Sequence, residues 1–396
     1  MSLTELKPGI RYVGVNDRRT TLFEGLWSLQ RGVSYNSYLV VGEKIALIDT
    51  VEEGFGSLLL QNIRREIGDR KIDYLIVNHM EPDHSSSMAA LRQFYPQMQI
   101  VGNSKTLQMM KGFYDIEDNT LEVKEGTTLD LGGKTLSFYM IPMVHWPETM
   151  VTWCAEDKTI FSGDAFGTFG ALDGAITDEH LHFEDFKEEM RRYYAAIVGK
   201  YGIPVQKALA KVAKLAPEMI CSTHGPVWQK EVAKVIELYD FVSKYKGENG
   251  VVVAYGSMYG NTEQMAERIA RELTEAGAEK VVVYNLSTAD PSYVLRDVFR
   301  YNSLVIGCPT YNNELYPPVA RLCEMIAGRC MPHRHFAGFG SFTWANAATR
   351  LLTEFTTKVK WEPVCPIQEM KQSFHEQTNG EACRLIARAI VEKMHA

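Results

Sequence analysis

The sequence lacks the long apolar runs and the leader segment that mark membrane and secreted proteins. No stretch approaches the roughly 18 consecutive apolar residues of a membrane span. The first residues contain no basic segment followed by an apolar core. We therefore predict a cytoplasmic protein that has no membrane partner.

Paired cysteines and excess positive charge are also missing. The seven cysteines are odd in number, scattered, and never spaced as Cys-x-x-Cys, which excludes a disulfide framework and a fused rubredoxin or iron–sulfur module. Lys and Arg number 42 against 49 for Asp and Glu, giving a net charge of -7. This balance disfavours nucleic acid as a partner.

The length of 396 residues exceeds one ordinary hydrophobic core, so we expect two domains. The chain opens with β-rich runs and continues with alternating β and α patterns. A polar, glycine-containing stretch at 244–250 is typical of a linker. We therefore predict one α/β domain at 1–247 and a second at 251–396.

The densest cluster of metal-binding side chains directly follows the apolar run 74–77. His79, Glu81, Asp83 and His84 fall within six residues. Three further candidates also follow apolar runs, and we expect strand ends of this kind to converge on one rim of an α/β fold. These candidates are His145, Asp164 and His224.

The set contains four imidazoles, three carboxylates and no thiolate, which suits iron or manganese, with zinc also possible. Two octahedral ions offer about 12 positions, and these residues with a bridging hydroxide fill about 10 of them. A lone histidine after a strand is more often a hydrogen-bonded loop residue. The joint pattern of seven nevertheless predicts a two-metal site with room for a small ligand.

The second half restarts as a regular alternation of strands and helices, which predicts a doubly wound parallel sheet. Its first strand, 251–255, is followed by a loop of small and hydroxyl residues at 256–262. Backbone amides at a helix N-terminus bind phosphate. The loop lacks both the Gly-Lys-Ser/Thr and the Gly-x-Gly-x-x-Gly patterns, so a mononucleotide phosphate fits better than a triphosphate or a dinucleotide.

Two later strand ends, 307–313 and 340–346, offer backbone donors and aromatic rings suited to a flat, polar-edged ring system. With the first loop they resemble flavodoxin, a resemblance that implies FMN. The residues that would hold the phosphate are Ser257, Met258, Tyr259, Gly260, Asn261 and Thr262. Those that would line the flavin ring are Pro309, Thr310, Tyr311, Asn312, Asn313, Ser341, Phe342, Thr343 and Trp344.

The first half resembles the metallo-β-lactamase fold superfamily, whose hydrolases usually carry His-x-His-x-Asp-His. Glu81 replaces the second histidine here. Exchanging a neutral ligand for an anion favours the higher oxidation state of a redox metal. The whole chain therefore resembles the flavodiiron protein family, with an αββα lactamase-like domain followed by a flavodoxin-like domain.

This resemblance implies two irons, one held by His79, Glu81 and His145, the other by Asp83, His84 and His224, with Asp164 bridging them. It implies reduction of dioxygen to water or of nitric oxide to nitrous oxide, with electrons passing through FMN. The expected partners are rubredoxin or another small electron donor, and a second copy of the chain in a head-to-tail homodimer or a dimer of dimers.

The sequence departs from many members at Phe23-Glu24-Gly25, where they carry a histidine. Tyr194 is our candidate catalytic residue beside the metals, although a tyrosine on a helix face more often serves packing. Two alternatives are a zinc hydrolase with a flavodoxin-like accessory domain, and an electron carrier with a vestigial metal site.

Overall fold

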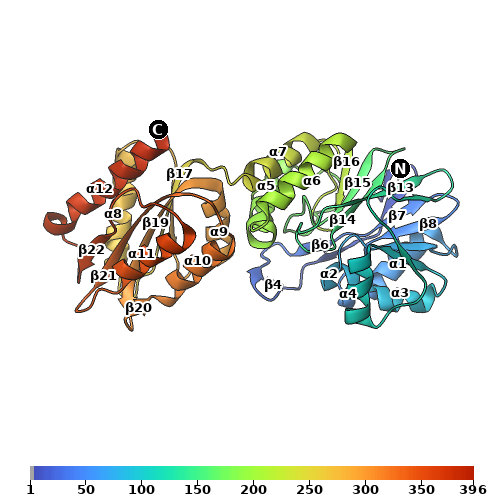
Figure 1. Cartoon of the computed structure of the whole chain (residues 1–396), viewed down its shortest axis with the longest axis horizontal. Helices are drawn as coiled ribbons and strands as arrows, with labels where there is room; N and C mark the ends of the chain where they lie inside the picture. Colours follow the sequence, from blue (N-terminus) through green and yellow to red (C-terminus); the bar gives the residue numbers. More distant parts are fainter. Residues whose placement is uncertain (1–3) are drawn as a thin grey trace. The chain divides into compact units, whose positions relative to one another are not determined.

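The computed structural model describes residues 4–396, which form two compact units that divide between Asp240 and Phe241. The first unit contains two sheets with helices on their outer sides, so its layers run α, β, β, α (Figure 1). The second contains one sheet with helices on both faces. The predicted α/β fold class, lactamase-like and then flavodoxin-like, is confirmed.

The first sheet of the first unit has seven strands, and the second sheet has five. In spatial order the first sheet is β1 (Glu5–Lys7), β2 (Ile10–Tyr12), β7 (Tyr38–Val41), β8 (Ile45–Ile48), β9 (Tyr74–Ile76), β10 (Gln99–Gly102) and β11 (Thr120–Glu122). The second is β12 (Thr128–Asp130), β13 (Thr135–Met140), β14 (Met150–Cys154), β15 (Thr159–Gly163) and β16 (Met219–Ser222). Two short hairpin-like pairs complete the unit: β3 (Val15–Asp17) with β6 (Val33–Tyr35), and β4 (Leu22–Phe23) with β5 (Trp27–Ser28).

Helices cover the outer side of each of these sheets (Figure 1). On the first sheet lie α1 (Gly56–Ile67), α3 (Met88–Phe94) and α4 (Ser104–Tyr114), while the short α2 (Pro82–Ser85) follows β9. On the second lie α5 (Phe183–Tyr193), α6 (Gly202–Leu215) and α7 (Val232–Ser243). Strands β8, β14, β15 and β16 are buried along their whole length, so the core lies between the sheets and under the helices.

The second unit is a parallel sheet in the order β18-β17-β19-β21-β22, which is the 2-1-3-4-5 order of a flavodoxin-like fold. Its strands are β17 (Glu248–Tyr255), β18 (Val281–Asn285), β19 (Tyr301–Tyr311), β21 (His335–Phe342) and β22 (Gln368–Lys371), with β20 (Glu314–Leu315) paired to β19. Its helices are α8 (Asn261–Glu275), α9 (Pro291–Arg300), α10 (Pro317–Gly328), α11 (Ala348–Val359) and α12 (Glu376–His395). The core cluster on one face joins the sheet to α8 and α12.

Strand β17 begins at Glu248, three residues earlier than the sequence predicted. Glu248 pairs with Tyr301 in the sheet, and its side chain binds Arg300 at 2.9 Å. These contacts draw the end of the predicted linker into the sheet, so only 244–247 connects α7 to β17.

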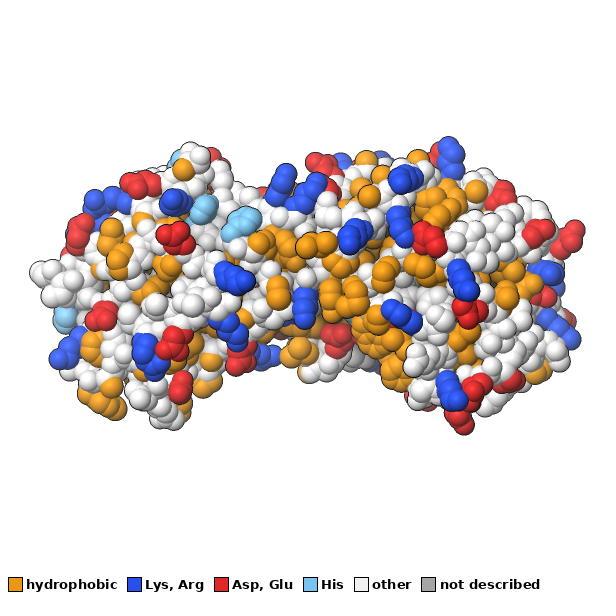
Figure 2. Space-filling model, in the orientation of Figure 1, with side chains coloured by type: hydrophobic (Ala, Val, Ile, Leu, Met, Phe, Trp, Pro, Cys, Tyr) orange, Lys and Arg blue, Asp and Glu red, His pale blue; other side chains and the backbone are white. Residues whose placement is uncertain are grey.

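Charged side chains of both signs are interspersed over the face shown in Figure 2, with hydrophobic side chains between them. Within residues 4–396, no helix is both long enough and apolar enough to cross a bilayer. Six of the seven cysteines are buried and Cys330 is exposed, and none forms a disulfide.

Candidate metal centre and cofactor pocket

The seven predicted metal ligands come together from strand ends of both sheets in the first unit. His79 lies just beyond β9 in the first sheet, while Asp164 and His224 follow β15 and β16 in the second. Positive φ angles at Gly163 and Gly225 turn the chain directly before Asp164 and directly after His224. The ends of separate strands therefore meet at one edge, as the sequence predicted.

The apolar run before His145 forms a strand only as far as Met140, so His145 does not directly follow a strand end as we predicted. Pro142 lacks an amide hydrogen for the sheet, and the Met143 amide donates to the Trp146 carbonyl at 2.7 Å, closing a turn. His145 therefore projects from a loop, yet it still reaches the other ligands.

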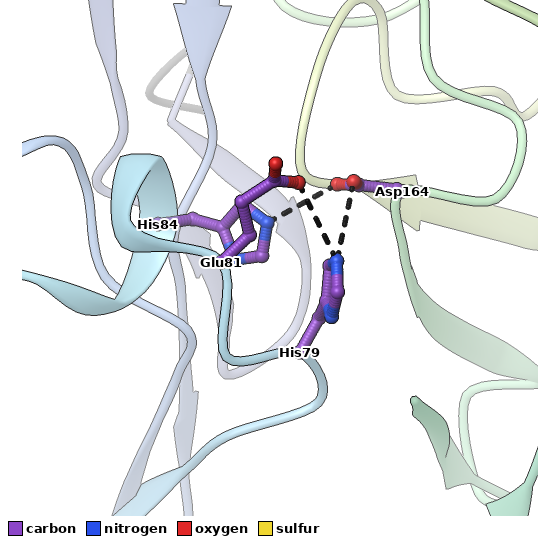
Figure 3. Close-up of side chains that lie close together, drawn as sticks. All are labelled: His79, Glu81, His84 and Asp164. Carbon is purple, nitrogen blue, oxygen red and sulfur yellow. Dashed lines mark ion pairs between the residues drawn. The ribbon is translucent and has the colours of Figure 1, made fainter. Parts of the chain in front are cut away.

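Three of the side chains surround one side of Asp164, and we call His79, Glu81 and His145 the His79 half. His145 Nε2 lies 3.0 Å from Glu81 Oε2 and 3.0 Å from Asp164 Oδ2. His79 Nε2 lies 3.5 Å from Glu81 Oε2 and 3.7 Å from Asp164 Oδ2 (Figure 3). Ligand atoms that share an ion with bonds of about 2.1 Å lie about 3 Å apart, so this spacing suits one metal.

The other three, Asp83, His84 and His224, form the His224 half. His224 Nε2 lies 3.2 Å from Asp83 Oδ2, and His84 Nε2 lies 3.5 Å from Asp83 Oδ1. Both imidazoles also face Asp164 Oδ1, at 3.3 Å from His84 and 3.5 Å from His224. Each half thus contains two imidazoles and one carboxylate of its own.

Asp164 lies between the halves and is fully buried. Its Oδ2 faces the His79 half and its Oδ1 faces the His224 half, while the Thr223 hydroxyl donates to Oδ1. A carboxylate that presents one oxygen to each of two ligand groups has the arrangement of a bridging ligand.

Several buried polar atoms in this cluster lack hydrogen-bond partners among residues 4–396. They are both carboxylate oxygens of Asp83, both ring nitrogens of His84, and Nε2 of His224. Unsatisfied buried polar atoms are rare and costly. A cation in their midst would satisfy the donor atoms that point inward, so these residues fit a metal centre.

The ionisation of the cluster also suits cation binding. Burial would raise the pKa of Asp164, but the charge of His84 and a hydrogen bond from His145 hold it well below its usual value. Burial would lower the pKa of His79, but its hydrogen bonds to Glu148 and Glu81 raise it well above the usual value. Protons on the imidazoles balance the carboxylates here, and cations can replace those protons.

The sequence did not predict the groups that contact Nδ1 of the candidate ligand imidazoles, on the side of the ring away from the centre. His79 Nδ1 contacts Glu148 Oε1 at 2.6 Å, and His224 Nδ1 contacts the Ser34 carbonyl at 2.8 Å. Such contacts fix the ring and its tautomer, leaving Nε2 for a metal. Glu148 offered a weak signal, because it follows His145 by three residues.

A tyrosine that the sequence analysis did not choose lies beside the centre. The Tyr193 ring is 5.6 Å from the His224 ring, and its buried hydroxyl has no hydrogen-bond partner among residues 4–396. Tyr194 instead packs edge-on against Tyr239 at 5.3 Å. The chain passes from the α-helix α5 into a π-helical turn, Tyr194–Val198, at this point.

A cavity of about 340 Å³ opens onto Glu81 and Asp83, and Phe23 and Glu24 line it. The Phe23 ring meets the His224 ring edge-on at 5.4 Å, and the Trp27 indole donates to Glu24 at 3.0 Å. Burial, and then the charge of neighbouring Glu81, raise the pKa of Glu24 to about 7. The segment that departs from many family members therefore forms part of the wall of this centre.

In the second unit, a cavity of about 620 Å³ lies at the carboxyl ends of β17, β19 and β21. It is lined by every residue predicted for the phosphate and flavin ring except Gly260. Ala345 and Gln372 also line it and were not predicted. Gln372 follows β22, a fourth strand end whose sequence carries no glycine-rich or aromatic signal.

The first loop of this pocket has the geometry of a phosphate cradle. Gly260 adopts φ +88° as the N-cap of the 15-residue helix α8, and its amide donates to Ser257 Oγ at 3.0 Å. The Thr262 and Ser341 hydroxyls lie 2.8 Å apart and join this loop to the loop after β21. The N-terminus of α8 suits an anionic group, and a volume of this size suits a mononucleotide.

Fold and site together define a two-unit α/β protein with a lactamase-like candidate metal site and a flavodoxin-like pocket. The family model of the ODP family beta lactamase matches residues 33–225, and that of flavodoxin matches 253–384. The anaerobic nitric oxide reductase flavorubredoxin of Klebsiella pneumoniae is 33% identical over 375 residues, covering 90% of this chain and 77% of that protein. The nitric oxide reductase of Moorella thermoacetica is 32% identical, with 89% of each chain covered.

Solved structures agree with these relatives. Rubredoxin oxygen:oxidoreductase from Desulfovibrio gigas superposes with a TM-score of 0.95 at 30% identity, covering 99% of this chain and 98% of that one. The flavodiiron protein from Giardia intestinalis gives 0.94 at 27% identity, covering 99% and 96%. The chain belongs to the flavodiiron protein family, as the sequence predicted.

Proposed function

We propose that this chain reduces nitric oxide to nitrous oxide, dioxygen to water, or both, at a di-iron centre in its first unit. The observation that carries the proposal is the position of Asp164, which presents one oxygen to each of two three-residue groups. Relatives named as nitric oxide reductases and a structural neighbour named as a rubredoxin oxygen:oxidoreductase support both substrates.

The His79 half would hold one iron and the His224 half the other, with Asp164 bridging them. Iron bound there would supply electrons and Lewis acidity to a small diatomic gas. The site contains no thiolate. Its carboxylates favour the higher oxidation state of a redox metal, a property that a purely hydrolytic zinc site does not need.

FMN would occupy the pocket of the second unit, with its phosphate at 257–262 and its ring against the loops after β19 and β21. Bound flavin exchanges electrons singly or in pairs, which suits it to link a one-electron donor to gas reduction. We propose 1–247 as the di-iron domain and 251–396 as the FMN domain.

Residues around the smaller cavity would admit the gas and supply protons. The apolar part of its lining, Leu22, Phe23 and Pro82, suits uncharged diatomic molecules, while five carboxylates also line it. Glu24 lines this cavity beside Glu81, and its carboxyl group can hold and release a proton there. The Tyr193 hydroxyl, buried and free of other partners among residues 4–396, is a further donor on this side.

Electrons would come from rubredoxin or another small donor, because a structural neighbour is named as a rubredoxin oxygen:oxidoreductase. We propose that it works in the cytoplasm as a head-to-tail homodimer or a dimer of dimers. An active monomer in equilibrium sedimentation would contradict the oligomer.

The test is metal and flavin analysis of the purified protein, followed by anaerobic assays of the reduced protein with nitric oxide and dioxygen separately. We expect two irons and one FMN per chain, with oxidation of the flavin by at least one gas. Zinc in place of iron, with no oxidation by either gas, would refute the proposal and favour a hydrolase.

A further inference from the structure

Glu148 is the only charged group that hydrogen-bonds a ligand imidazole from behind among the residues that the structure describes. It is 1% exposed and lies three residues beyond His145. Its Oε1 accepts from His79 Nδ1 at 2.6 Å and from the Met80 amide at 2.9 Å. Because one oxygen accepts two N–H donors, the carboxylate is fixed in position behind the His79 ring.

The other half of the centre has no equivalent carboxylate. His224 Nδ1 contacts the neutral carbonyl oxygen of Ser34 at 2.8 Å. Within 4–396, His84 Nδ1 has no hydrogen-bond partner. The nearby buried carboxylate of Asp49 accepts from the Asn78 amide and side chain, at 2.8 and 3.0 Å, rather than from a ligand imidazole.

Glu148 therefore gives the surroundings of the His79 half one more negative charge than those of the His224 half. Each half has two imidazoles and one carboxylate of its own, and the halves share Asp164. A carboxylate on Nδ1–H draws the proton away from the ring and makes the opposite nitrogen, Nε2, a stronger metal ligand. A neutral carbonyl does so less strongly.

We infer that Glu148 is a positioning residue that makes the two metal sites unequal, so that the His79 half binds a divalent cation first and more tightly than the His224 half. The inference rests on the proposed metal centre and adds an order of filling to it. Removing outer hydrogen-bond partners of metal-bound histidines lowers metal affinity by about 10- to 100-fold. The effect of losing the Glu148 charge should fall on the first binding step.

The experiment is a titration of the metal-stripped full chain with Co²⁺, against a competing chelator, followed by cobalt absorption and by metal analysis. The wild type should bind two ions in two separated steps. Glu148→Gln keeps the shape and an acceptor oxygen but removes the charge, and should weaken the first step by about 10- to 100-fold. The second step should move much less.

Two further variants separate charge from folding. Glu148→Asp keeps the charge with a shorter reach, and should restore part of the first-step affinity. Glu43→Gln removes the same charge from an exposed position in the first unit, and should leave both steps unchanged. FMN binding and circular dichroism of each variant report whether the chain is folded.

Each outcome bears on a different statement. If Glu148→Gln binds the first ion as tightly as the wild type, or weakens only the second step, the inference is wrong while the metal centre stands. If the wild type binds fewer than two ions, the proposed centre itself is wrong, and the order of filling falls with it.

Discussion

The two candidate sites are built in opposite ways. In the first unit, His79, His84, Asp164 and His224 are fully buried. In the second, the pocket carries some of the most exposed large apolar side chains of the described residues, with Trp344 91% exposed and Tyr259 89% exposed. One site is closed and set before its ligand arrives, while the other is an open surface that a ligand would cover.

This difference shows how each site obtains its specificity. The metal centre uses side chains fixed by a second layer, such as Glu148 behind His79 and Thr223 on Asp164. The flavin pocket uses loops at strand ends, backbone amides and the N-terminus of α8. A change of one side chain should therefore be felt more sharply in the first site than in the second.

The largest effect is expected from Asp164→Asn, because this side chain serves both halves of the closed site. The amide loses the negative charge and presents one nitrogen, so at least one iron should be lost. Turnover should fall by more than about 100-fold, exceeding the typical loss for an outer-layer change. Iron analysis and gas-reduction assays measure this, with exposed Asp69→Asn as the control.

FMN content should stay unchanged in Asp164→Asn. Loss of FMN together with iron would show that the two sites depend on one another. It would contradict the view that they are built independently.

A medium effect is expected from Asn261→Asp in the open site. Asn261 lines the pocket at the start of α8, where a new carboxylate would repel the phosphate. Repulsion of about 1.5–3 kcal/mol corresponds to about 10- to 100-fold weaker FMN binding. Fluorescence titration of the flavin-stripped chain gives the affinity, and Gln264→Glu, exposed on the same helix, is the control. Equal weakening by both variants would contradict a phosphate at 257–262.

A smaller effect is expected from Tyr193→Phe. Removing the hydroxyl beside His224 should lower turnover by about 5- to 30-fold, the equivalent of one hydrogen bond of about 1–2 kcal/mol, with two irons retained. Tyr194→Phe should change turnover less, because that ring packs against Tyr239. Steady-state assays with iron analysis compare the pair. The reverse order would restore the catalytic role that the sequence suggested for Tyr194.

The smallest effect concerns stability in the metal-free protein. Burial would lower the pKa of His145 and His224, but their ion-pair contacts with Asp164 and the other carboxylates raise these pKa values to about 9 and about 10. The stability from these charged imidazoles is present below the unfolded pKa of about 6.5 and is lost as the pH rises through the folded values. Between pH 6.5 and 10 the melting temperature of the first unit should fall by about 5 °C or more.

Calorimetry with and without bound metal checks this expectation. The metal-loaded protein should lack the decrease, because coordinated imidazoles are already neutral. A similar decrease in the metal-loaded protein would place its cause outside the metal centre.

Much of both sites was predictable, because strand ends in α/β folds gather at one edge. The apolar runs before His79, Asp164 and His224 were enough to predict that the seven candidate ligands lie close together. The glycine- and hydroxyl-rich loops of the second half likewise predicted nearly the whole lining of its pocket.

The parts that were missed depend on contacts between distant segments or on irregular backbone. Glu148 approaches His79 across 69 positions of sequence, and no local pattern records that contact. Tyr193 and Tyr194 are both buried and are adjacent at a change from α-helix to π-helix, where helical periodicity no longer tells which ring lies beside His224. Gln372 enters the pocket from β22, whose short sequence gives no sign of binding.

Because Trp344 is exposed, its fluorescence should report whether a flavin is bound in the pocket. All six tryptophans lie in residues 4–396, and Trp344 is the only exposed one. Its emission should therefore lie furthest to the red, and a flavin beside it should quench that component by energy transfer. The red edge of the emission spectrum would then report flavin occupancy during purification or dilution, without any added dye.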